Sequence, residues 1–271
     1  GSLQLYRNLQ QELADNTRIH NPDAVAPDTT GDIEFSNVSV SYPGEERDAL
    51  QHVSFTVPAR KTIALVGPSG SGKSTIANLL TGLINPSEGE MKLAGTPYLS
   101  LDSDLLKSKI AYVTQESVVF RGSVLKNVTM WEQDPNFGRT EQLLGRVDLK
   151  HLVGRTGEEN GLDVRSAGTD ISGGERQRLS IARELYRQFD LLILDEATSA
   201  LDSELETRID ELFQEVKGKA TVVVIAHRLS TIRNADVIHV LDTGQLVESG
   251  SYDELIDNGG PFAKMIDSQA L

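Results

Sequence analysis

A glycine-rich turn between an apolar run and a helical pattern constrains the fold of this chain more than any other feature. The apolar run covers residues 62–66, and residues 76–83 carry apolar side chains at the spacing of an amphipathic helix. The turn fits the pattern G-x-x-x-x-G-K-[ST] and reads Gly67-Pro68-Ser69-Gly70-Ser71-Gly72-Lys73-Ser74. Glycines let successive backbone N–H groups face inward, and a helix start attracts anions, so the turn predicts a phosphate site.

Two side chains of this turn carry the prediction further, toward a nucleotide. Lys73 would bring a positive charge to the β- and γ-phosphates, and the Ser74 hydroxyl would bind Mg²⁺. Thr75, the next residue, belongs to the same predicted phosphate-binding set. The alternative is an ordinary glycine-rich turn before a helix, which the flanking strand and helix patterns make far less favourable.

A pair of carboxylates follows a second apolar run. Residues 191–194 are Leu-Leu-Ile-Leu, and Asp195 and Glu196 come next. In a parallel sheet both acids would lie at the carboxyl edge, where ligands bind. Asp195 would then bind Mg²⁺, and Glu196 would orient an attacking water or accept its proton. Taken alone, the pair would more readily be solvated acids that end a strand; together with the lysine turn, the functional interpretation is favoured.

A second glycine-rich stretch, residues 171–178, precedes another helical pattern. Ser172 and Glu175 fit the S-x-x-E capping box, so a purely structural helix start would explain them. The box does not require Gly173 and Gly174, which would expose backbone N–H groups at a second anion site. One nucleotide has no obvious use for two such sites about 100 residues apart, whereas two chains that face each other would use both.

Strand and helix patterns along the chain predict a parallel α/β core. Alternating apolar residues at 33–42 predict half-buried strands, and residues 117–188 lack strand runs and predict an inserted helical lobe. Apolar runs at 191–194 and 221–226 predict buried strands separated by a charged helix. Residues 237–247 predict a closing hairpin.

Composition excludes several classes of protein. With 40 acidic and 26 basic residues among 271, the net charge of −14 disfavours nucleic-acid binding. The chain has no cysteine, which excludes disulfides, thiol catalysis and Cys-based zinc sites. Its apolar runs are far shorter than the roughly 20 residues that a bilayer span needs.

Together these motifs resemble the nucleotide-binding domain of ABC transporters, of the exporter type. The resemblance rests on the lysine turn, the Ser-Gly-Gly run and the stretch Leu-Asp-Glu-Ala-Thr-Ser-Ala-Leu-Asp at 194–202. Residues 33–38 and Ser41-Tyr42-Pro43-Gly44 further resemble the opening of exporter domains. The similarity covers about residues 32–251.

The resemblance implies a fold and a division of the chain. We expect an α/β P-loop NTPase (RecA-like) core with an antiparallel β subdomain and an inserted α-helical subdomain. The ATPase domain would cover 32–251, with its core at 32–116 and 189–251 and its helical subdomain at 117–188. Residues 1–31 would be a linker after a transmembrane domain, and 252–271 a C-terminal helical tail.

It also implies roles for further residues. Tyr42 would stack on adenine; the less favoured alternative is ordinary core at a strand end. Gln115 would contact Mg²⁺ and water, and His227 would contact the γ-phosphate. Asp202 would lie near the partner's phosphate loop, or simply cap a helix. The signature residues Ser172, Gly173, Gly174 and Glu175 would bind the γ-phosphate held by the other protomer.

Two departures from the family pattern concern the signature. Ile171 stands where leucine is usual, and Glu175 stands where glutamine is commonest. A carboxylate here would repel a triphosphate unless the capping geometry turns it back to its own helix start. Val164-Arg165-Ser166 replaces the usual Val-Gly-Glu, which puts signalling to the membrane part through that loop in doubt.

The resulting hypothesis is an ATPase domain that dimerises head to tail around two Mg·ATP and powers export from the cytoplasmic face of a membrane. Its partners would be ATP, a transmembrane domain and a second nucleotide-binding domain, identical or different. Two alternatives are an ABC-type ATPase of DNA repair or chromosome maintenance and a non-hydrolysing nucleotide switch. The short spacing of the motifs and the acidic balance disfavour the former, and the intact Glu196 disfavours the latter.

Overall fold

The computed structural model describes residues 23–45, 47–152, 163–164, 171–197, 203–225 and 229–269. A six-stranded sheet forms its centre, in the order β12-β11-β3-β10-β9-β6. Five neighbouring strands are parallel, and β12 closes one edge as the antiparallel partner of β11. These strands are β3 (Thr62–Val66), β6 (Ile110–Val113), β9 (Leu191–Asp195), β10 (Thr221–Ile225), β11 (Val237–Asp242) and β12 (Gln245–Gly250).

The continuous apolar runs form β9 and β10, in which every residue is buried, as strands covered on both faces require. The expected closing hairpin is β11 and β12. The helical patterns after β3 and β9 form α2 (Lys73–Leu80) and α7 (Ser203–Gln214). The predicted parallel α/β core is therefore confirmed.

A second, antiparallel sheet in the order β2-β1-β4-β5 forms an arm beside the core. In β1, Phe35 and Val38 are both buried because a register irregularity at Asn37, with φ of 52°, shifts the alternation by one residue. The arm contains β1 (Ile33–Val40), β2 (Leu50–Val57), β4 (Glu88–Leu93), β5 (Thr96–Pro97), η1 (Tyr98–Ser100) and α3 (Ser103–Ser108).

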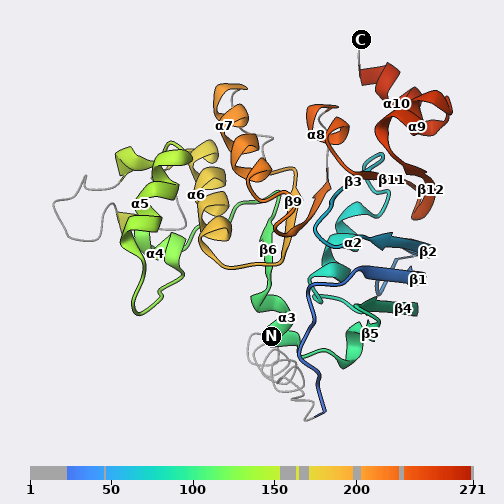
Figure 1. Ribbon diagram of the computed structural model, residues 1–271, viewed down its shortest axis with the longest axis horizontal. Helices are drawn as coiled ribbons and strands as arrows, with labels where there is room; N and C mark the ends of the chain where they lie inside the picture. Colours follow the sequence, from blue (N-terminus) through green and yellow to red (C-terminus); the bar gives the residue numbers. More distant parts are fainter. Residues whose placement is uncertain are drawn as a thin grey trace, which may run out of the picture.

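The helical lobe lies on the opposite side of the six-stranded sheet from the arm (Figure 1). Its main helices are α4 (Val124–Thr129), α5 (Phe137–Arg146) and α6 (Gly173–Tyr186), with η2 (Lys150–Leu152) between them. The expectation of no strands in this lobe was wrong in one detail. β7 (Gly122–Ser123) and β8 (Asp163–Val164) form a two-residue antiparallel pair, too short to leave an alternating pattern in the sequence.

Three further helices complete the described structure: α8 (Leu229–Arg233), α9 (Tyr252–Asp257) and α10 (Pro261–Gln269). The last two form the expected helical tail and lie beside β12. Within the described residues, no helix is both long and apolar enough to span a membrane.

Two apolar clusters occupy the two faces of the six-stranded sheet. Alternate residues of each strand point to different clusters: Leu191 and Ile193 of β9 join the cluster shared with the arm and α2, whereas Leu192 and Leu194 join the cluster shared with the helical lobe. The same alternation holds in β10 and β3. The sheet therefore separates two cores.

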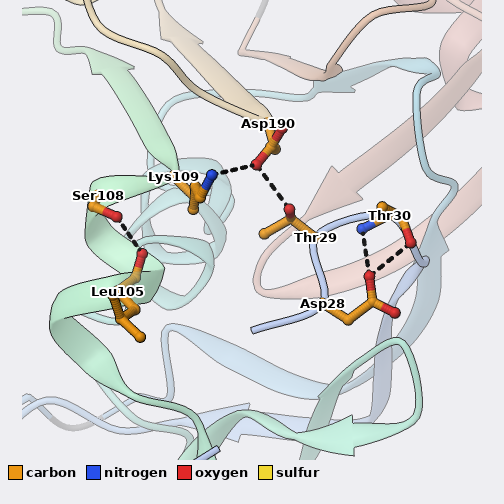
Figure 2. A network of polar contacts seen from close by, with 7 residues as sticks. All are labelled: Asp28, Thr29, Thr30, Leu105, Ser108, Lys109 and Asp190. Atoms are coloured by element: carbon orange, nitrogen blue, oxygen red, sulfur yellow. Dashed lines mark hydrogen bonds and ion pairs between the residues drawn. The ribbon is translucent and has the colours of Figure 1, made fainter. Parts of the chain in front are cut away.

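The described part of the expected linker contacts the domain at two points. Val25 forms a parallel bridge with Leu101, with backbone hydrogen bonds to Ser100 and Asp102. The Thr29 hydroxyl donates to Asp190 Oδ2 over 2.8 Å, and Lys109 pairs with the same oxygen at 3.5 Å (Figure 2). Residues 23–31 thus lie against the amino ends of β6 and β9; residues 1–22 lie outside the described residues.

Candidate functional site

The phosphate loop joins β3 to α2 in a conformation that two of its glycines make possible. Gly67 and Gly72 have φ of 146° and 102°. A Cβ at Gly67 would overlap the carbonyl oxygen of Leu241, and one at Gly72 would lie 2.6 Å from a Leu50 methyl carbon. Gly72 is also the N-cap of α2, where no side chain caps the helix. The first N–H groups of α2 are therefore left without a side-chain acceptor.

Lys73 is buried inside this loop. Its Nζ donates to the carbonyl oxygens of Gly67 and Pro68, both at 2.8 Å, and lies 3.4 Å from Ser71 Oγ. Burial lowers the pKa of Lys73, and the carboxylates of Glu196 and Asp195 oppose that shift. The lysine charge thus lies where anionic phosphate would stabilise it.

Asp195 ends β9 at the carboxyl edge and is buried. Its Oδ2 accepts hydrogen bonds from Ser74 Oγ and from the Tyr112 hydroxyl, both at 3.3 Å. Burial raises the pKa of Asp195, partly opposed by these two donors. Burial likewise raises the pKa of Tyr112, which keeps this donor protonated. Sequence analysis missed Tyr112, since one tyrosine in an apolar strand gives no sign of a carboxylate partner.

The residues around Asp195 fit Mg²⁺. A hydroxyl, a carboxylate and an amide oxygen are hard oxygen ligands, and Mg²⁺ in nucleotide sites takes one or two carboxylates together with substrate phosphates. Ser74 and Asp195 are already in hydrogen-bond contact, and Gln115 lies on the loop that follows β6. These three residues could hold the ion.

Glu196 has a left-handed backbone, with φ of 49°. This conformation is uncommon for a non-glycine residue and tends to occur where a site constrains the chain. Gln115 Nε2 donates to Glu196 Oε2 over 2.9 Å, and Gln177 Nε2 donates to the Glu196 carbonyl oxygen over 3.2 Å. Gln177, on α6 of the helical lobe, has no sequence signal because its partner is 19 residues away.

The signature forms the N-terminus of α6 and contains both halves of a capping box. Ser172 Oγ accepts the Glu175 N–H over 3.2 Å, and Glu175 Oε2 accepts from the Ser172 N–H and hydroxyl, each at 2.8 Å. These bonds, the backbone one foremost, lower the pKa of Glu175 to about 2. The other oxygen, Oε1, lies 3.0 Å from His151 Nε2 of η2, a contact that sequence analysis missed. Glu175 is thus turned back to its own helix start, as the capping pattern predicts.

Tyr42 lines a pocket of about 660 Å³ that reaches Gly70 of the phosphate loop. It also packs against the arm's apolar cluster, so both sequence interpretations of this residue have a structural counterpart. The sequence does not predict the rest of the lining, because it comes from two segments that are far apart in the chain, residues 45–51 and 243–245. Besides Tyr42 and Gly70, the lining consists of Glu45, Arg47, Asp48, Ala49, Gln51, Thr243, Gly244 and Gln245.

The remaining predicted site residues divide into two groups. Ser71 and Thr75 are buried in the loop and in α2, and Pro68 accepts from Lys73, whereas Ser69 and Gly70 are exposed. His227 and Asp202 lie outside the described residues. So do Arg165 and Ser166, which belong to the stretch that stands in place of the family's Val-Gly-Glu.

A strand–turn–helix phosphate loop, with one carboxylate at the end of a parallel strand of the same sheet and a second just after it, defines a P-loop nucleotide-binding domain. Residues 50–199, more than half of the chain, match the family described as "ABC transporter". The chain therefore belongs to the ABC transporter family, and it is an ABC-type ATPase domain of the P-loop fold.

Comparisons with two relatives and one solved structure indicate which kind of ABC transporter this chain resembles. The chain is 44% identical over 237 residues to an ATP-dependent lipid A-core flippase of Burkholderia orbicola and 43% identical over 237 residues to one of Haemophilus influenzae, covering 87% of this chain and 40% of each relative. A solved bacterial Atm1-family ABC exporter with ATP bound superposes with a TM-score of 0.86 at 33% identity, covering 99% of this chain and 49% of that one. The chain thus spans about two fifths of the curated relatives, and these matches favour the exporter hypothesis over both alternatives.

Proposed function

We propose that this chain binds Mg·ATP at the carboxyl edge of the six-stranded sheet and hydrolyses it. The observation that carries the proposal is the meeting of the phosphate loop with β9. Ser74 Oγ lies 3.3 Å from Asp195 Oδ2, and the charges of Asp195 and Glu196 both act on buried Lys73. When bound, Mg²⁺ would offset negative charge on the phosphates, with Ser74, Asp195 and Gln115 as its protein contacts.

Within this site, Glu196 orients the attacking water or accepts its proton. Gln115 already donates to one carboxylate oxygen of Glu196, which restricts the rotation of that side chain. His227 follows β10, the neighbour of β9, and is proposed to contact the γ-phosphate. Closure of the site would exclude bulk water and bring these groups into register with the phosphate.

The pocket beside Tyr42 accommodates the base. It joins the phosphate loop at Gly70, so a nucleotide can extend from the loop toward the aromatic ring. Stacking on an aromatic ring is worth about 1–3 kcal/mol per base in single-strand binders and needs no contact with the base edge.

A second nucleotide-binding domain completes the arrangement. The tip Ser172–Gly174 is proposed to bind the γ-phosphate held by the other protomer, with Asp202 near that protomer's phosphate loop. ATP then stabilises the closed dimer by its differential affinity for the closed state. The partner domain is either an identical or a different one.

A transmembrane part is the proposed partner outside the dimer, with the domain at the cytoplasmic face of the membrane. The relatives are about two and a half times as long as their matched portion, and their names describe flippases. The helical lobe carries exposed large apolar side chains from the end of β6 to the first residue of α5, which suit a membrane-domain loop: Val118, Phe120, Met130, Trp131 and Phe137. Closure of the dimer would thereby drive export.

Substitution of Glu196 tests this proposal. We expect Glu196→Gln to keep ATP affinity, to lose at least about 100-fold in phosphate release and to accumulate an ATP-bound dimer in sedimentation experiments. Glu141→Gln, at an exposed position of α5, serves as the control and should behave as wild type. If the wild-type chain released no phosphate even at high protein concentration, the non-hydrolysing switch would be favoured instead.

A further inference from the structure

The signature helix carries a charge arrangement that the capping box does not require. One oxygen of Glu175 is fully used by the box, and the other meets His151, whose η2 segment lies 24 positions earlier in the chain. The histidine side chain is 42% exposed and the glutamate 19% exposed. The contact therefore lies at the rim of the signature tip, where a ligand would approach.

The same chain provides a comparison for this arrangement. At the start of α9, Ser251 and Glu254 form an identical capping box, in which Glu254 Oε2 accepts from the Ser251 N–H and hydroxyl at 2.8 and 2.9 Å. Within the described part of the chain, Glu254 has no cationic partner. A capping box thus forms without a histidine, and His151 is not needed to begin α6.

The contact of His151 with Glu175 therefore concerns the charge of the signature tip, Ser172–Gly174. A triphosphate that approaches Gly173 and Gly174 meets the Glu175 carboxylate in the first turn, where like charges repel. The His151 imidazole Nε2 lies 3.0 Å from Oε1, so an N–H on that nitrogen donates to the carboxylate and offsets part of its charge. The nearest basic neighbour on the helix, Arg176, directs Nη1 to the carbonyl oxygen of Ile171 instead, over 3.0 Å.

We propose that His151 is a positioning residue for the signature, which offsets the charge of Glu175 and so permits the tip to accept the γ-phosphate of ATP held by a second nucleotide-binding domain. The proposal rests on the proposed function. An exposed contact of this kind adds little to folding stability, so removal of His151 should leave the fold intact and act on ATP-dependent association.

The test uses the whole chain with Glu196→Gln, which holds ATP without turnover, and sedimentation against Mg·ATP concentration. Adding His151→Gln should raise the ATP concentration for half-maximal dimer formation by about threefold to tenfold. His151→Lys should restore it, because the lysine ammonium group also offsets the carboxylate charge of Glu175. His52→Gln, an exposed histidine of β2, is the matched control and should change nothing. Unfolding in urea confirms that each variant is folded.

A double substitution isolates the charge effect. With Glu175→Gln present, His151→Gln should no longer alter dimer formation, because the charge to be offset is absent. An equal loss in both backgrounds would overturn the proposal, as would normal dimer formation by the His151→Gln chain. If no variant, including the parent, formed an ATP-dependent dimer, the proposed dimer function would fail as well, which separates the two failures.

Discussion

α2 and α6 both begin beside glycines, and they differ in whether a side chain caps their first N–H groups. α2 follows Gly72 and has neither a side-chain cap nor an acid in its first turn. α6 follows Ser172 and is closed by its own capping box, with Glu175 in the first turn. One helix start (the open start) has no side-chain cap, and at the other (the closed start) the cap accepts the N–H of Glu175.

The charged side chains at the two helix starts, Lys73 and Glu175, respond to folding in different ways. Burial lowers the pKa of Lys73, so folding alone disfavours its charged form. Hydrogen bonds from Ser172 lower the pKa of Glu175, so folding favours its charged form. The charged form of Lys73 therefore lowers folding stability at the start of α2, but it is available to an anionic ligand. At the start of α6, the charged form of Glu175 is stabilised without a ligand.

Lys73→Ala should produce the largest effect. Removing a buried positive charge from the open start should weaken ATP binding by at least about 100-fold, because several charge-assisted hydrogen bonds to phosphate are lost. Fluorescent-nucleotide titration measures the affinity, with Lys92→Ala on the exposed surface of the arm as control. Unchanged affinity would show that the open start does not bind phosphate.

Tyr42→Ala should come next. The open start is continuous with the pocket at Tyr42, so loss of the ring should weaken ATP binding by about 1–3 kcal/mol, while Tyr42→Phe should bind almost normally. The same titration measures both variants. An unaffected Tyr42→Ala chain would return this residue to a packing role in the arm.

Ser172→Ala addresses the closed start. Loss of an N-cap should lower the free energy of unfolding by about 1 kcal/mol, and Ser251→Ala at the matching box of α9 should lower it by a similar amount. ATP binding by the monomer should survive both changes, whereas ATP-dependent dimer formation should weaken only in Ser172→Ala. Equal dimer formation by the two variants would remove the distinction between these boxes.

Thr29→Val should have the smallest effect, at the opposite edge of the sheet from both helix starts. It removes the hydrogen bond to Asp190, and we expect a loss of about 0.5 kcal/mol in unfolding free energy with ATP affinity unchanged. Thr30→Val is the control, because Thr30 bonds only to neighbouring Asp28 in the network of Figure 2. A larger loss in Thr30→Val would contradict the interpretation of the contact.

The sequence predicted the features that are local along the chain. Apolar runs defined β9 and β10, the glycine pattern located the phosphate loop, and the S-x-x-E spacing anticipated the direction in which Glu175 turns. In each case the residues that interact are neighbours in a strand, a turn or a first helical turn, so the physical cause is visible in the sequence.

Contacts between distant segments could not be predicted in the same way. His151 meets Glu175 across 24 positions, Tyr112 meets Asp195 across 83, and Gln51 joins the turn at Thr243 across 192. In each pair at least one member belongs to no spacing pattern, because tertiary packing alone brings the two segments together. The short β7–β8 pair could not be predicted either, because a strand of two residues is too short to show an alternation of apolar and polar side chains in the sequence.

The division of the sheet into two apolar clusters gives neighbouring core positions separate meanings. Val223 of β10 packs with the arm and α2, and the next residue, Val224, packs with the helical lobe. Cavities made at these adjacent valines would weaken different apolar clusters. Comparing the unfolding of the two variants by heat or denaturant would therefore show which cluster unfolds first.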